Sequence, residues 1–224
     1  MIRFFEFFHI VEVIASSSPV ALRRHGDVLT HTFSSPSKSG KMGYFEVMIQ
    51  PIPKAFMAAD LGHDLGIRGH EALSKIKSVK GFNISFKEES DSHPVRAYLP
   101  TGKSASPTHV ITEVISAVKT LIEVERPKVL QFYGSTVDQK SVYHKLYTIF
   151  LRPAGYQLVE NSLGMDYYVH TDLLQELLGA RFEFEMSKFS AKDVDRKKQL
   201  KAQKRESPST ATKPQSVRKG IFTW

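Results

Sequence analysis

The chain has 224 residues, 41% of them hydrophobic, which is enough to bury one sizeable core and leaves room for extensions. It contains no cysteine, which excludes disulfides, thiolate metal sites and cysteine nucleophiles and fits a reducing compartment. Its formal net charge is +8 at pH 7. The position of the excess basic residues along the chain indicates which kind of partner the charge could serve.

The first 15 residues are rich in phenylalanine. Their spacing fits either a helix or a pair of buried strands, and both alternatives stay open. Glu6, His9 and Glu12 interrupt the apolar run, which is therefore shorter than the ~18 residues that span a bilayer and unlike a signal peptide. The sequence predicts a soluble intracellular protein that is neither secreted nor membrane-spanning.

Ser, Pro and Gly are frequent between Gly26 and Gly43, which predicts a loop. Residues 44–52 alternate between two faces and predict a strand that ends, or lies at a sheet edge, where Pro51 and Pro53 occur. Glycines punctuate the segment from Lys54 to Gly81 and predict short helical pieces.

Two strands and a long helix are expected next. Residues 81–89 predict a strand, residues 90–94 a hairpin turn and residues 95–99 the returning strand. An apolar stripe at helical spacing predicts a helix from Pro107 to Glu125, with proline in its first turn and another proline just past its end.

Residues 128–170 predict a strand, a helix, a sharp break and a further strand. Val129–Tyr133 is a short apolar run, and Val142, Leu146, Ile149 and Phe150 recur at helical spacing behind it. Gly155-Tyr156 then closes the helix. This step from a helix to a glycine-aromatic pair resembles the last part of the GNAT N-acetyltransferase fold.

The resemblance to the GNAT family covers roughly Tyr44 to Phe184. It implies an α/β (α+β) fold with a mixed central sheet flanked by helices. We therefore divide the chain into an N-terminal apolar segment and loop (residues 1–43), a GNAT-like domain (44–187) and a largely disordered basic tail (188–224).

In the GNAT family, a glycine-rich turn before the long helix binds the pyrophosphate of coenzyme A through backbone N–H groups. The equivalent turn here, Thr101–Pro107, lacks the paired glycines, so the resemblance implies the fold more than acetyl transfer, and an ordinary strand-to-helix turn is the favoured reading. If acetyl-CoA binds, the resemblance implies two sets of candidates. The cofactor-binding candidates are Gly102, Lys103, Ser104, Ala105 and Ser106, and the candidates for the leaving-group tyrosine are Tyr143 and Tyr147.

The tail carries the whole charge excess. Lys188–Trp224 contain 11 Lys and Arg against 3 Asp and Glu, and the rest of the chain has 20 of each. Its first part, Ala191–Glu206, is compatible with a polar helix, and the remainder is expected to be extended. A basic tail suits nucleic acid or an acidic protein surface, with a partnerless solubilising tail as the alternative. The candidate partner-binding residues are Arg196, Lys197, Lys198, Lys201, Lys204, Arg205, Arg218, Lys219 and the only tryptophan, Trp224.

A second resemblance concerns origin. The pattern TGKSAS, HVITEVISAVKTLIE, RPKVLQFYG and KSVYHKLYTIFLRPAGY is similar to uncharacterised proteins of large tailed bacteriophages. This resemblance implies a virion component or a host-modulating factor, found in the virion or the host cytoplasm.

Metal and hydrolase chemistry find no support in the sequence. Asp60, His63, Asp64, His70 and Glu71 cluster along the chain, but the spacing of the two histidines fits no standard metal signature, so we predict no metal. Two hypotheses remain. The favoured one is a non-catalytic GNAT-like binding or structural protein without a cofactor, which docks to nucleic acid or a protein assembly through its tail. The alternative is an acetyl-CoA-dependent N-acyltransferase with an atypical turn.

Overall fold

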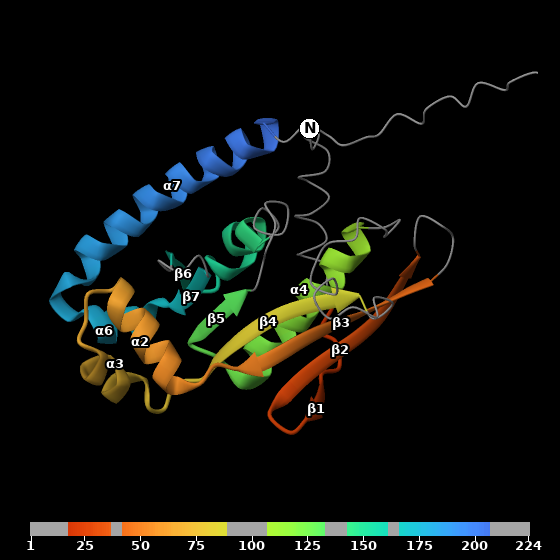
Figure 1. Ribbon diagram of the computed structural model, residues 1–224, viewed down its shortest axis with the longest axis horizontal. Coiled ribbons are helices and arrows are strands. Elements are labelled where there is room, and N and C mark those ends of the chain that lie inside the picture. Colours follow the sequence, from red (N-terminus) through yellow and green to blue (C-terminus); the bar gives the residue numbers. More distant parts are fainter. Residues whose placement is uncertain (1–17, 37–41, 89–106, 133–142, 161–165, 207–224) are drawn as a thin grey trace, which may run out of the picture.

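The computed structural model describes residues 18–36, 42–88, 107–132, 143–160 and 166–206. They form a mixed seven-stranded sheet with helices packed on both faces, which confirms the predicted α/β class (Figure 1). The strands are β1 (Arg23–His25), β2 (Val28–Pro36), β3 (Met42–Pro51), β4 (Gly81–Glu88), β5 (Val129–Phe132), β6 (Tyr156–Glu160) and β7 (Asp166–His170). The helices are α2 (Lys54–Asp64), α3 (Gly69–Ile76), α4 (Pro107–Glu125), α6 (Thr171–Leu178) and α7 (Phe182–Glu206), with the short helix η2 (Gly179–Arg181) before α7.

The strands lie side by side in the order β1-β2-β3-β4-β5-β7-β6. Strands β4 and β5 are parallel, and every other neighbouring pair is antiparallel. A parallel pair needs a crossover, which α4 provides between β4 and β5. Strand β7 lies between β5 and β6 although it follows both in the sequence.

The predicted loop between Gly26 and Gly43 is wrong for residues 28–36, which form β2. Gly26 adopts φ +61° in the tight turn between β1 and β2. Strand β2 then pairs along its length with β3, and the Phe33 and Phe45 rings stack at 5.4 Å. The loop was predicted from the Ser, Pro and Gly content of 26–43, but the stretch also contains Val28, Thr30, Thr32 and Phe33, which suit a strand that pairs with β3. The expected domain boundary after residue 43 thus falls within β3.

Strands β3 and β4, and the helical pieces between them, confirm the predictions for this part of the chain. The side chains of Phe45, Val47 and Ile49 are buried on one face of β3, as the alternation predicts. Strand β3 ends at Pro51, and Gly66, at φ +62°, separates α2 from α3. The predicted strand 95–99 and the phenylalanine-rich N-terminus lie outside the described residues.

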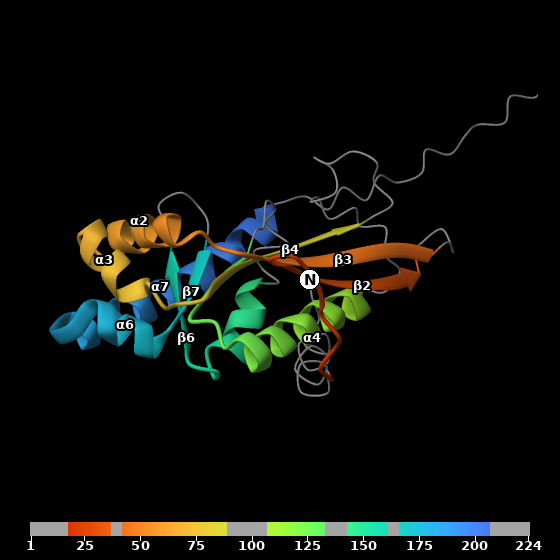
Figure 2. The same cartoon turned by 90° about the horizontal axis from the view of Figure 1, so that it is seen from below.

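Two apolar cores flank the sheet. On one face, α4 and the helical residues 143–151 cover residues such as Ile84, Leu130 and Tyr168. On the other face, α2, α3, α6 and α7 cover Val129, Tyr167 and Val169. Figure 2 shows α4 and α2 on opposite sides of the sheet. The alternation of neighbouring strand residues between the two cores follows from the period of two in a strand.

The helix before Gly155 is present as predicted, with one local feature that periodicity does not reveal. Residues 143–146 are α-helical, and Tyr147–Leu151 continue as a π-helical turn. Gly155, at φ +88°, follows and leads into β6. Helix α6 was not predicted, whereas the expected polar helix 191–206 is confirmed as the larger part of α7.

Candidate functional site

The carboxyl ends of β4 and β5 form the first candidate region. The two strands pair from Gly81–Val129 to Ile84–Phe132, and β4 then continues to Glu88 with β3 as its only described strand neighbour. In open α/β sheets, ligands bind outside the carboxyl ends of parallel strands. The candidate turn Gly102, Lys103, Ser104, Ala105 and Ser106 directly precedes α4 in the sequence and lies outside the described residues.

The two candidate tyrosines lie in the core beside this region. The Tyr143 ring is 5.0 Å from the ring of Phe132, the last residue of β5, and burial raises the pKa of its hydroxyl. The Tyr147 hydroxyl donates to Asp193 Oδ2 on α7 at 2.8 Å, and burial, together with that carboxylate, raises the pKa of this phenol as well. Tyr143 therefore borders the carboxyl ends of the strands, whereas the Tyr147 hydroxyl is committed to α7.

Tyr168 completes this aromatic cluster, and sequence reasoning missed it. Its ring lies 5.3 Å from that of Phe132 and 5.4 Å from that of Tyr147. The side chain is fully buried, its hydroxyl contacts no hydrogen-bond partner among the described residues, and burial raises its pKa well above the usual value. The Tyr-Tyr pair at 167–168 was the available signal, because one of two adjacent tyrosines in a strand must face the α4 side.

The basic C-terminal segment begins as a helix that is anchored to the body. Phe189 is buried in the core under α7, and Asp193 accepts the Tyr147 hydrogen bond. The Arg196 guanidinium forms a two-point ion pair with the Asp166 carboxylate, with an Nη1–Oδ1 distance of 2.7 Å. These three α7 residues recur at helical spacing and hold one face of the helix against the sheet. The expected boundary after Ser187 therefore falls inside a helix whose contacts with the body continue to Arg196.

Beyond Arg196, the charged residues of α7 are all basic until its last residue, Glu206. They are Lys197, Lys198, Lys201, Lys204 and Arg205, with four uncharged residues between them. Lys198 lies 3.4 Å from Asp195 in an exposed ion pair, a kind of contact that contributes little. Arg218, Lys219 and Trp224 lie outside the described residues. Of the predicted partner-binding residues, Arg196 is thus committed to Asp166, and five others continue the same helix.

A polar cluster lies at the opposite end of β5. Lys128 Nζ is 2.6 Å from Asp172 Oδ2, and His170 Nδ1 accepts from the Asp172 backbone N–H at 3.3 Å. Burial and the neighbouring Lys128 ammonium lower the pKa of His170, although Asp172 acts in the other direction. The His170 ring also closes on Gly155, where an added Cβ would lie 3.1 Å from Nε2. The His170 side chain thus caps the start of α6, and the Thr171 backbone N–H donates to the Gly155 carbonyl at 2.8 Å.

Within the described ranges, no group of three or more His, Asp or Glu side chains is arranged to hold a metal ion. None of the described helices combines the length and the apolar character needed to cross a bilayer. No protein-family model, curated protein or solved structure matches this chain.

Proposed function

We propose that the protein is a non-catalytic GNAT-like binding protein that docks on nucleic acid through the basic end of α7. The observation that carries the proposal is the change of character along this helix. Up to Arg196 it is anchored by Phe189, Asp193 and the ion pair with Asp166. From Lys197 it presents five basic residues without an intervening acid. The anchored half of the helix thus leads directly into a half whose sequence is strongly basic.

The array has dimensions that suit a phosphate backbone. Ten residues from Lys197 to Glu206 span about 15 Å of helix, and one DNA strand carries a phosphate about every 3.4 Å along the axis. In the sequence, Lys197, Lys201 and Lys204 recur at intervals of four and three residues, the spacing that suits contacts with successive phosphates. Such contacts are independent of base sequence, so we expect binding to any duplex. For a phage-encoded protein, as the second resemblance implies, the duplex would be met in the virion or the infected host.

The test is fluorescence anisotropy of a labelled DNA duplex titrated with the full chain over a salt series. Each phosphate neutralised adds about −0.9 to the slope of log K against log salt, so the triple variant K197Q/K201Q/K204Q should flatten the slope by roughly 2 to 3. The matched control K77Q/K188Q/K192Q loses the same charge from exposed positions on the body and the anchored half of α7. It should leave the slope near that of the original chain.

The residues outside the described helix are tested separately by a chain that ends at Glu206. This end point keeps Phe189, Asp193 and Arg196, which a chain ending at Ser187 would lose. We expect it to retain most of the salt-sensitive binding. Equal losses in the two triple variants, or no binding even at low salt, would contradict docking on nucleic acid and leave a protein assembly as the partner to test.

The alternative, an acetyl-CoA-dependent N-acyltransferase, is supported by the parallel strands. From β4 onward the described order is strand, helix, strand, helix, strands, which fits the expected order except for the strand 95–99 outside the described residues, and Tyr143 borders the end of β5. A thermal shift with acetyl-CoA tests this activity, since a ligand that binds only the folded state raises the melting temperature. A shift that Gly102→Val and Lys103→Ala abolish would favour the enzyme. An unchanged melting temperature in the presence of acetyl-CoA would contradict the enzyme alternative.

A further inference from the structure

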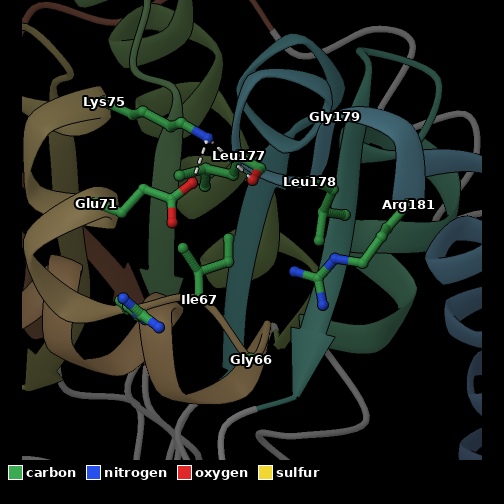
Figure 3. A pocket seen from close by; sticks show the side chains of 9 residues that line it. Gly66, Ile67, Glu71, Lys75, Leu177, Leu178, Gly179 and Arg181 are labelled. Carbon is green, nitrogen blue, oxygen red and sulfur yellow. Dashed lines mark hydrogen bonds and ion pairs between the residues drawn. The ribbon is translucent and has the colours of Figure 1, made fainter.

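A pocket lies between α3 and the turn that joins α6 to α7 (Figure 3). Its lining includes no residue from the carboxyl ends of β4 and β5 or from the basic end of α7. Its volume is about 440 Å³, within the range of roughly 300–1,000 Å³ that is usual for small-molecule sites. Arg68, Lys75 and Arg181 line it together with a single carboxylate, Glu71. Apolar side chains, including those of Ile67 and Leu178, form another part of the wall.

The carboxylate in the pocket is matched by one of the three cations. Lys75 Nζ lies 3.1 Å from Glu71 Oε1 and donates to the Leu177 carbonyl at 3.3 Å. Lys75 thus offsets both Glu71 and the partial negative charge at the carbonyl end of α6. Two guanidinium charges remain in excess.

These two guanidiniums are available to a ligand. Arg181 Nη2 donates to the Leu65 carbonyl at 3.1 Å, a neutral partner that orients the group without cancelling its charge. Figure 3 shows the Arg181 guanidinium pointing into the space beside Ile67 and Leu178. Arg68 makes no ion pair with any residue in the described part of the chain. Gly66 and Gly179 also line the pocket, and a Cβ added at Gly66 would lie 3.8 Å from Arg181 Nη1.

We propose that this pocket binds a small phosphomonoester. Such a group carries a charge of about −1.5 to −2 at pH 7, which matches the two guanidiniums in excess. Planar guanidiniums bind phosphate oxygens through paired N–H donors, and the small apolar surface at Ile67 and Leu178 suits a compact ring or chain on the ester side. The pocket does not depend on the nucleic-acid function, because Arg181 precedes α7 whereas Lys197 lies about 22 Å further along that helix.

Isothermal titration calorimetry of the full chain in low-chloride buffer tests the proposal, with phenyl phosphate, inorganic phosphate and phenylacetate as probes. We expect saturable binding of phenyl phosphate, weaker binding of inorganic phosphate, which lacks the ring, and the weakest binding of phenylacetate, which carries one charge. R68Q and R181Q should each weaken phenyl phosphate binding about tenfold or more, because each removes charge-assisted hydrogen bonds.

The controls separate local recognition from general charge. K77Q removes one positive charge directly after α3 but outside the pocket, so it should leave the affinity within about twofold. R68Q breaks no described contact, so its melting temperature should equal that of the original chain. R181Q loses the hydrogen bond to the Leu65 carbonyl, so its affinity is compared with that of the original chain only if its melting temperature is also unchanged. Binding of duplex DNA should be the same in R68Q and the original chain.

Several outcomes would overturn the proposal. One is the absence of saturable heat with phenyl phosphate at about 10 mM. Another is equal weakening by R68Q and K77Q, which would place the effect in the overall charge. Phenylacetate binding as tightly as phenyl phosphate would assign the pocket to carboxylates instead.

Discussion

The hydrogen bond from Tyr147 to Asp193 is a buried polar link between α7 and the rest of the molecule. Both side chains are buried, at 1% and 8% exposure, so Tyr147→Phe leaves the Asp193 carboxyl without this donor in a place that water scarcely reaches. Hydrogen bonds to charged groups contribute about 1.5–3 kcal/mol, and for a chain of this size 1 kcal/mol shifts the melting temperature by roughly 2–4 °C. We therefore expect Tyr147→Phe to lower the melting temperature by about 3–12 °C.

A double-mutant cycle with Asp193→Ala, followed by urea denaturation, isolates the pair. Once Asp193 is gone, Tyr147→Phe should cost far less, which gives a coupling energy of about 1–2 kcal/mol. Tyr44→Phe is the matched control, since Tyr44 is 59% exposed and loss of its hydroxyl should change stability by under about 0.5 kcal/mol. A coupling energy below about 0.3 kcal/mol would refute the view that this bond holds α7.

Two further predictions concern the polar cluster at the start of α6. Gly155→Ala should destabilise the fold by about 1–3 kcal/mol in urea, because φ is +88° and the new Cβ would lie 3.1 Å from His170 Nε2; a cost that is unchanged in an H170A background would show that the crowding contributes nothing. The pKa of His170 is lowered in the folded chain, so as the pH falls the unfolded chain protonates this histidine first. The contribution of His170 to the free energy of unfolding is therefore fully present above its usual pKa. It is lost as the pH falls toward the pKa of the folded state. The stability advantage of the original chain over His170→Gln should thus shrink between about pH 7.5 and about pH 5, and a constant difference across that range would contradict the assignment.

Elements with a strong local pattern were predictable from the sequence. Helix α4 begins at Pro107 and ends at Glu125 as expected, because an apolar stripe and flanking prolines define it without help from the rest of the fold. Strand β3 was equally accessible through its alternation. Strand β2 was not, since the Ser, Pro and Gly residues around it masked its short strand pattern, and its pairing with β3 is visible only in the fold.

The sites were less accessible than the elements. The basic residues of α7 were predicted from the sequence as a partner-binding segment. The ion pair between Arg196 and Asp166 was not predicted, because it joins parts of the chain that are distant in the sequence. The pocket between α3 and the turn before α7 was not predictable from the sequence, because Arg68 and Arg181 are more than 100 residues apart and no motif joins them. Tyr168 was hidden for a related reason: its place in the aromatic cluster depends on β7 lying between β5 and β6.

The position of β7 also imposes a sequence of events on folding. Strand β6 is synthesised before β7, yet within the described sheet it reaches β5 only through β7. Until β7 arrives, β5 presents one open edge and β6 has no neighbour, so this half of the sheet assembles late and through contacts that local pairing cannot replace. A chain released after Glu160 would expose both strands as templates for pairing with other chains, which makes completion of the last quarter a safeguard against aggregation.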